Sequence, residues 1–298
     1  MAATLAADFG FQPQVAKDHI SAYFRKKLVI GAFAYNDNTL KGEDGDIIDF
    51  PFYGKVGAAE KPAETASLTV DNLTDGSFQA TVFEVGKAVG FTKKSLRKHA
   101  KGADGAFMEA SSQIAQVHAE LLEDELITVM DTPANHDVVF TATLVGDLAT
   151  IRLLNQSRLI GFGDRADEAM VWFVHSHNWL DFLNDSTAGF LKMDANDPFM
   201  RVPGFQGRIF GMAVVITDNV PREADIGGKR VYASYIAKAN SYGFLEAQET
   251  EIEDDYDLLA RQYVMTGNQW YAVRGFHKAV STDDSRLLKM TMASSVDA

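Results

Sequence analysis

The chain of 298 residues contains no cysteine. Disulfide frameworks, thiolate zinc sites, iron–sulfur clusters and cysteine nucleophiles are therefore excluded. The first residues, MAATLAADFGFQPQ, lack the basic segment followed by an apolar segment that marks a secretory signal. No window approaches ~18 consecutive apolar residues, so we expect no membrane span. Together these absences predict a soluble protein that is made in the cytosol.

Short motifs of the common enzyme classes are also missing. The sequence has no Walker loop, no dinucleotide-binding fingerprint, no G-x-S-x-G turn and no H-E-x-x-H pair. Basic residues are outnumbered, with 28 Lys and Arg against 41 Asp and Glu and a net charge of −13. A protein dedicated to reading nucleic acid needs a basic face, so this balance disfavours that class. The hydrophobic fraction of 46% and the aromatic fraction of 11% predict an ordered globular chain.

The most informative stretch runs from Gly45 to Asp131. It begins with the strand-like GDIIDFPFYG, passes through turn-rich residues 58–77, and returns in the strand-like FQATVFEVGKAVGFT. This order predicts a hairpin whose arms of ~10–12 residues would each reach roughly 35–40 Å. Because an isolated two-stranded ribbon is only marginally stable in water, we expect the hairpin to lie on another subunit.

A long amphipathic segment follows, and it predicts a helix over about residues 104–130. Apolar residues recur there at spacings of three and four and form one stripe: Ile114, Val117, Leu121, Leu122, Leu126, Val129 and Met130. About 26 residues at 1.5 Å each give a length of roughly 40 Å. Pro133 ends the helix, because the residue before a proline is pushed out of the helical region.

Five basic residues separate the second strand from this helix: Lys93, Lys94, Arg97, Lys98 and Lys101. One interpretation is an inward face that contacts packaged nucleic acid or an acidic neighbour. The other is an ordinary solvated helix face. Residues 1–30 are likewise open to two interpretations: an arm that crosses a neighbour, or a helix packed on its own domain. The remainder mixes strands and helices without βαβ regularity, which favours an α+β architecture.

Two clusters are candidates for metal chemistry. His175 and His177 would share a face of an extended segment and could chelate zinc, manganese or iron, although no third ligand follows nearby. The alternative is a pair of structural histidines at a strand end. The acidic run from Glu246 to Asp257 could hold a cation between subunits, but it lacks the central glycine and the fixed spacing of a calcium loop. Its alternative is a solvated rim.

The order of these parts resembles the major capsid proteins of tailed bacteriophages. These proteins have the Hong Kong 97-like fold, which encapsulins share. In that family the hairpin is the extended loop, and the long helix is the spine of the peripheral domain. Two later stretches also resemble the family, MVWFVHSHNWLDFLND and GRIFGMAVVITDNVP. Under this resemblance His175 is a structural feature and not a metal ligand.

The resemblance implies an α+β capsid fold in four parts. These are an N-terminal arm (1–34), an extended loop hairpin (45–91), a peripheral domain (35–44, 92–134 and 260–298) and an axial domain (135–259). Eight residues of the arm and the hairpin are predicted to contact neighbouring subunits: Phe9, Phe11, Phe52, Tyr53, Lys55, Lys61, Leu68 and Val70.

The implied function is that of a major capsid protein without enzymatic activity, cofactor, metal or membrane contact. Its copies would form pentamers and hexamers in an icosahedral shell, assembled in the host cytoplasm, around double-stranded DNA that the inner face contacts non-specifically. Portal and decoration proteins are further expected partners. No coiled-coil segment precedes the arm and the chain begins at Met1. We therefore expect no built-in scaffolding domain and no cleaved prosequence, and either a separate scaffolding protein or none.

Two alternatives stay open from the sequence. One is an encapsulin-like shell, which would need a site for cargo on its inner face. The other is a metal-dependent enzyme that uses His175 and His177.

Overall fold

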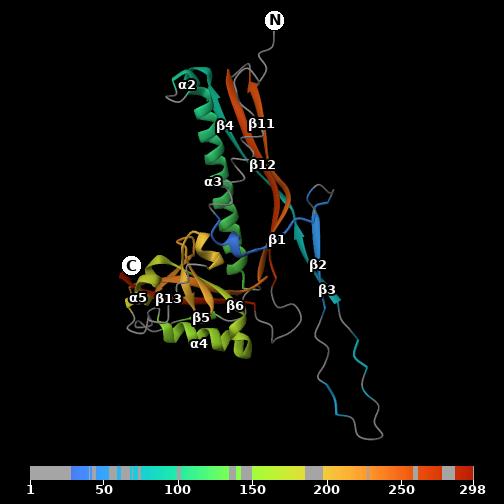
Figure 1. Cartoon of the computed structure of the whole chain (residues 1–298), viewed down its shortest axis with the longest axis vertical. Coiled ribbons are helices and arrows are strands. Elements are labelled where there is room, and N and C mark those ends of the chain that lie inside the picture. The colour runs from blue at the N-terminus through green and yellow to red at the C-terminus, as the bar shows by residue number, and fades with distance from the viewer. Residues whose placement is uncertain are drawn as a thin grey trace.

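The computed structural model describes residues 28–39, 41, 45–53, 59–61, 68, 70–72, 75–98, 102–133, 139–141, 150–184, 197–226, 228–257, 261–276 and 286–297. The molecule is elongated, as Figure 1 shows. One half consists of a long helix lying along a narrow sheet, and the other half is a second sheet with helices packed on it. A short hairpin lies beside the junction of the two halves.

The long helix is α3 (Gly102–Asp131), which spans 30 residues. It lies along a sheet with the strand order β1-β11-β12-β4. The bounds of these strands are Tyr35–Asp37 for β1, Tyr242–Asp257 for β11, Gln262–Gly275 for β12 and Phe83–Thr92 for β4. A short helix, α2 (Lys93–Lys98), joins β4 to α3 at the far end. The predicted helix is confirmed and is slightly longer than expected.

The apolar stripe of α3 is narrower than the spacing predicted. Ile114, Leu122 and Leu126 are buried in the core, whereas Val117 and Leu121 keep 41% and 38% of their surface exposed. These two residues lie at the edge of the stripe, and the sheet covers only one side of the helix. The closest approach is at Gly267 of β12, where a Cβ atom would lie 2.7 Å from Ile114 Cγ2.

The second sheet has seven strands within the described part of the chain, in the order β5-β13-β10-β6-β8-β7, with β9 beside β10. The bounds are Val139–Thr141 (β5), Leu287–Asp297 (β13), Lys229–Lys238 (β10), Ala169–Val174 (β6), Met212–Ile216 (β8), Phe205–Ile209 (β7) and Arg222–Ile226 (β9). The two helices beside it are α4 (Ile151–Phe162) and α5 (Ser176–Asn184), and single turns are η2 (Gly31–Phe33), η3 (Gly163–Glu168) and η5 (Pro198–Arg201). This mixture of helices and sheets confirms the α+β class.

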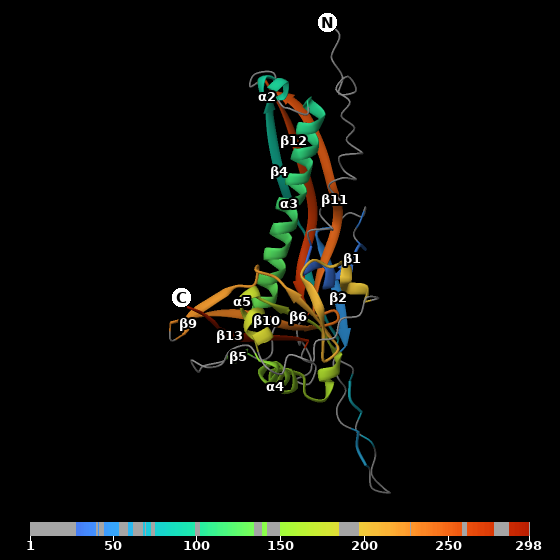
Figure 2. The ribbon, with the colours of Figure 1, turned by 60° about the vertical axis from the view of Figure 1, so that its left-hand side comes forward.

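Both faces of the second sheet are covered, which explains why β6 is a continuous apolar run, AMVWFV. Trp172 points into a cluster with Trp179 and Phe182 of α5, and this cluster also contains residues of α4. The next residue, Phe173, points the other way, into the core that contains α3. Figure 2 shows α3 rising from one side of this sheet and α4 lying on the other.

The second strand-like run does not form one continuous arm of the hairpin. It divides at Val82 into β3 (Asp75–Thr81), which pairs with β2 (Ile47–Tyr53), and β4, which pairs with β12. Val82 donates its backbone N–H to the carbonyl of Asp46 at 2.8 Å, and its side chain is buried. The paired arms are therefore 7 residues each, which corrects the longer arms expected from the sequence.

Strand pairing also departs from the division that the resemblance implies. That division groups residues 260–298 with the long helix, but only β12 lies beside it, and β13 pairs with β10 and β5 in the second sheet. Conversely, β11 falls in the range expected for the axial domain, yet it pairs with β12 along α3. Backbone pairing between distant strands, and not their order in the sequence, decides which sheet each strand belongs to.

The close approach of α3 to β12 generates a test. Replacement of Gly267 by valine should lower the free energy of unfolding of the unassembled subunit by about 1–3 kcal/mol, because the added atoms overlap Ile114. Urea denaturation followed by circular dichroism measures the loss. The matched control is Gly90→Ala on β4, where the nearest atom lies 3.5 Å from the new Cβ. An equal loss in both variants would contradict the packing.

Candidate functional site

A buried carboxylate on α3 binds the backbone near the start of the described residues. Glu123 of α3 is only 2% exposed, and it accepts hydrogen bonds from three consecutive backbone N–H groups. The donors are Val29 at 2.8 Å, Ile30 at 2.9 Å and Gly31 at 3.0 Å. Hydrogen bonds to an ionised acceptor are about twice as strong as neutral ones. We call this arrangement, Glu123 with residues 29–31, the arm anchor.

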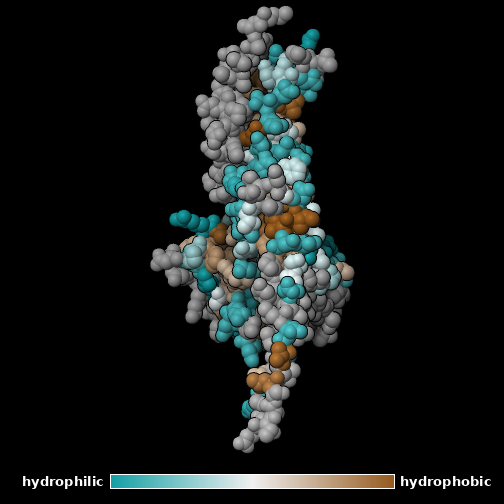
Figure 3. Space-filling model, turned by 90° about the vertical axis from the view of Figure 1, so that its right-hand side faces the viewer, coloured by the Kyte–Doolittle hydropathy of each residue, from teal (hydrophilic) through white to brown (hydrophobic). Residues whose placement is uncertain are grey.

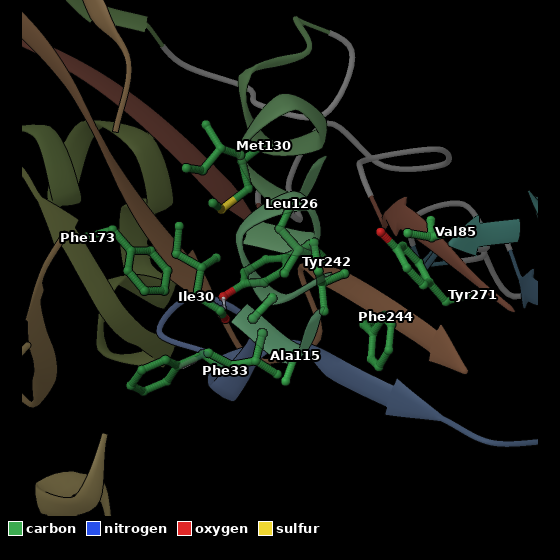
Figure 4. Close-up of a cluster of buried hydrophobic side chains, with 14 of the residues drawn as sticks. Ile30, Phe33, Val85, Ala115, Leu126, Met130, Phe173, Tyr242, Phe244 and Tyr271 are labelled. Carbon is green, nitrogen blue, oxygen red and sulfur yellow. Dashed lines mark hydrogen bonds between the residues drawn. The ribbon is translucent and has the colours of Figure 1, made fainter. Parts of the chain in front are cut away.

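The arm anchor is embedded in the main core. Tyr242 of β11 donates its hydroxyl to the carbonyl of Ile30 at 3.0 Å, and Figure 4 shows this bond as a dashed line. Phe33 packs edge-on against Phe173 of β6, with ring centroids 5.7 Å apart. The last part of the expected N-terminal arm (1–34) is therefore fixed to α3, to the first sheet and to the second sheet at once.

The other end of α3 is tied to the second sheet by a polar cluster. Asp131 accepts the hydroxyl of Tyr235 at 2.6 Å and lies 2.5 Å from Nζ of Lys289. Lys289 also lies 2.6 Å from a carboxylate oxygen of Glu223. Its positive charge sits where the carbonyl end of the helix dipole favours a cation. Burial and these two carboxylates act in opposite directions on the pKa of Lys289, and the carboxylates raise it.

The histidine pair has a geometry that differs from the expected one. His175 follows β6, but His177 belongs to α5, so the two do not share the face of an extended segment. The ring of His175 stacks on Tyr232 at 3.8 Å, and its Nδ1 accepts the backbone N–H of His177. Nδ1 of His177 lies 2.9 Å from the Tyr232 hydroxyl. One nitrogen of each ring is thus already engaged within the protein.

The remaining nitrogen of His175 faces a single exposed acid, Asp218, at 3.6 Å. Burial lowers the pKa of His175, and the nearby Asp218 opposes that shift. Within the described ranges of the chain, no three His, Asp or Glu side chains gather in a way that would hold a metal ion. The same statement covers the acidic run of β11, where Glu249 forms an ion pair with Lys41.

The predicted contact residues fall into three groups. Phe9, Phe11 and Lys55 lie outside the described residues. Phe52 and Tyr53 form the end of β2, opposite Gly76 and Asp75 of β3. Lys61, Leu68 and Val70 are exposed, with Leu68 at 64% and Val70 at 87%. Apolar side chains so open to water are suited to contact with a partner, and the set remains a prediction.

Sequence reasoning missed both the arm anchor and the cluster at Asp131. In the sequence, Glu123 counts among the polar residues that surround the apolar stripe, as an ordinary solvated carboxylate. Its neighbours Leu122 and Leu126 are fully buried, so its position on the covered side of the helix was the one available signal. In the described part of the chain, no helix combines the length and the apolarity that a membrane crossing requires.

Known proteins provide a comparison for this architecture. No family model matches the chain. The major capsid protein of Staphylococcus phage phiMR11 is 25% identical over 239 residues, which cover 77% of this chain and 80% of that protein. The chain is related to this capsid protein in sequence, which confirms the resemblance.

Solved structures agree with that relationship. The capsid of Ralstonia phage GP4 matches with a TM-score of 0.69 at 10% identity, over 91% of this chain and 92% of that chain. The capsid of cyanophage Pam1 matches with a TM-score of 0.67 at 14% identity, over 89% of both chains. The head of Helicobacter pylori bacteriophage KHP40 gives 0.63 at 11% identity, over 87% and 86%. The chain therefore has the Hong Kong 97-like fold of phage capsid proteins, as the resemblance implied.

The arm anchor generates a prediction on stability. Glu123→Gln should lower the free energy of unfolding of the unassembled subunit by about 1–3 kcal/mol, because an amide group replaces an acceptor of three backbone N–H groups. Thermal or urea unfolding measures the effect. Glu120→Gln on the exposed side of the same helix is the matched control and should change stability little. Equal effects of the two substitutions would contradict the anchor.

The same residue predicts a dependence on pH. Burial raises the pKa of Glu123, and its three backbone hydrogen bonds only partly oppose this. The folded chain therefore holds the proton more tightly than the unfolded chain does. The resulting stabilisation is full below the usual glutamate pKa of about 4.3 and is lost as the pH rises through the raised pKa. The stability advantage of the wild type over Glu123→Gln should shrink across that window, and an advantage that grows with pH would refute the assignment.

Proposed function

We propose that the chain is the major capsid protein of a tailed bacteriophage. Its copies assemble as pentamers and hexamers into an icosahedral shell that encloses the double-stranded DNA genome. The observation that carries this proposal is the match to a phage major capsid protein over 77% of the chain, joined to a capsid fold that extends over about nine-tenths of it. The kinship implies a structural role and not an enzymatic one.

The shape of the molecule supports the proposal physically. A long narrow half and a hairpin beside it add surface that a compact enzyme would not need. Each such part offers a modest contact, and many simultaneous contacts convert modest affinities into a stable assembly. Rings of identical subunits require contacts between two different surfaces, which close by rotation.

The strand pairing supports a revised division of the subunit. In this proposal the peripheral domain is α3 with the β1-β11-β12-β4 sheet, and the axial domain is the seven-stranded sheet with α4 and α5. The arm and the β2–β3 hairpin are the parts that reach other copies. The eight residues predicted from the sequence, from Phe9 and Phe11 to Leu68 and Val70, are kept as proposed contacts.

Further partners belong to the proposal as well. A separate scaffolding protein, a portal, decoration proteins and packaged DNA on the inner face follow from the capsid role, with assembly in the host cytoplasm and a final location in the virion. An encapsulin-like shell is less favoured, since the matching structures are phage capsids. A metal enzyme built on His175 and His177 is less favoured too, because both rings already bind within the protein.

Size-exclusion chromatography followed by negative-stain microscopy tests the proposal. The purified chain should form closed particles of megadalton mass, alone or with its scaffolding protein. A small stable oligomer under all conditions, or one that binds stoichiometric zinc, would overturn it.

The hairpin generates a more specific prediction. Deletion of residues 58–77 should leave a soluble, folded subunit that forms no shells, because few of these residues enter the hydrophobic cores of the described chain. Microscopy counts the particles, and circular dichroism confirms the fold. The matched control replaces the same residues with a Gly/Ser linker of equal length, which restores the connection without the side chains. Normal particles from either variant would refute the contact role of the hairpin.

A further inference from the structure

Two charged segments at the far end of the long half have opposite signs. The end of β11 carries acidic residues and no basic residue from Glu246 to Asp257, and α2 carries basic residues and no acidic one. Figure 1 places α2 and the outer end of β11 at the same tip of the molecule. The eight contact residues of the proposed function include none from α2 or β11. A subunit contact at the tip would deepen that function and rests on it.

The strand register places four of the acidic residues on the outer face of the sheet, while Asp254 lies on the face toward α3. Ile252 of β11 lies opposite Gly267 of β12, and a Cβ atom on Gly267 would point at Ile114 of α3. The side chain of Ile252 is therefore on the side of the sheet that faces α3. Because successive side chains of a strand alternate, the residues at odd positions point away from α3. They form a column on the outer face that we call the acidic column: Glu251, Glu253, Asp255 and Asp257.

The basic residues lie on the opposite side of the same sheet. Nζ of Lys93 sits 4.6 Å from the centre of the Tyr256 ring, and Tyr256 shares the face of Ile252. Its neighbour Tyr263 is paired with Phe91, which packs on Phe107 of α3. The helix α2 is thus on the α3 side. Lys94 and Lys98, one turn apart on α2, are both exposed and form what we call the basic pair.

The surface beside the acidic column is open and low. The outer face of β12 carries neutral residues opposite the acids, such as Thr266 and Val264. Beyond them the outer face of β4 carries Gly86, Ala88 and Gly90, all exposed, with Glu84 and Thr92 on either side of them. Figure 3, seen from the side of β1 and β11, shows a largely hydrophilic surface over this half where it is coloured. Because Gly86, Ala88 and Gly90 have no side chain or a small one, another element can approach this part of the sheet closely.

We propose that the acidic column of one copy receives the basic pair of a second copy. The acidic column and α2 lie on opposite sides of one sheet, so a neighbour placed face to back brings the column of one copy to the basic pair of the other. Such a contact joins two different surfaces, which is the kind of contact that a ring of identical subunits requires. Complementary charges also steer the encounter and fix its register.

Three competing roles for these charges predict different results. Acidic residues on β11 can simply keep an edge strand from pairing wrongly, since β1 covers this strand only at residues 243–245. The basic pair can instead contact packaged DNA. The column can also hold a cation alone. None of these roles requires that the two charged sets depend on each other.

Charge reversal distinguishes the proposed contact from these roles. One variant carries Lys94→Glu with Lys98→Glu, and another carries Glu253→Lys with Asp255→Lys. At 0.15 M salt each should reduce the yield of shells at least tenfold. The variant with all four substitutions should recover to within about threefold of the wild type, because every contact then joins reversed partners. Circular dichroism on the unassembled subunits checks that all variants fold.

The controls separate failure of this contact from failure of the proposed function. Arg152→Glu with Arg201→Glu changes the net charge equally on exposed positions elsewhere and should assemble like the wild type. If the wild type forms no shells, the proposed function itself fails. If shells form and neither reversal reduces them, or if the fourfold variant is no better than the pairs, the contact is refuted. Normal shells with reduced DNA retention in the lysine variant would refute it in favour of DNA contact.

The absence of cysteine permits a direct second test. Lys94→Cys chains are mixed with Asp255→Cys chains, assembled and oxidised. Because each chain carries one thiol, every disulfide that forms joins two subunits. A covalent pair of the two different chains should accumulate in shells, and a mixture of Lys94→Cys with Asp164→Cys chains should give at least tenfold less. Equal yields in the two mixtures would overturn the proposed contact even if the charge variants fail to assemble.

Discussion

The buried carboxylate of Glu123 is the constraint on which the rest of this architecture depends. An ionisable group in an apolar core is costly unless its acceptors are satisfied, and here three consecutive backbone N–H groups satisfy them. Those N–H groups belong to the turn that leads into η2, so they would otherwise be orphaned donors. The backbone N–H groups therefore satisfy the buried carboxylate, and the carboxylate satisfies the N–H groups. Its position fixes where the chain enters β1 and, through Phe33, where the second sheet meets α3.

The two halves of the molecule are joined through α3, which is held at two points along its length. Its middle holds the arm anchor, and its last residue, Asp131, joins Tyr235 and Lys289 of the second sheet. One continuous core contains residues of α3, β6 and β10 together. Interiors packed in this way do not deform gradually. The core that the two halves share therefore opposes bending between them.

Local patterns predicted the elements, and long-range pairing decided their places. The spacing of Ile114, Leu122 and Leu126 was enough to predict α3, because helical periodicity is a local property. The division of one strand-like run at Val82 was not predictable, because β3 and β4 have the same alternation and differ only in their partners. The partners of β11 and β13 could not be predicted from the sequence for the same reason. The arm anchor was missed for a different reason, because a glutamate on a helix is solvated in most proteins.

An assembling subunit must stay soluble as a free copy and must also associate with other copies, and the charges of this chain affect both. A net charge of −13 keeps free copies apart and soluble, yet it also opposes their association. At physiological ionic strength this repulsion is screened beyond about 8 Å, whereas charges that meet directly across a contact are screened much less. The repulsion caused by the net charge therefore weakens with separation. The arrangement of charges on each surface decides which surfaces can touch. The proposed contact between the acidic column and the basic pair would be such an arrangement, because its two charged sets lie on different sides of one sheet.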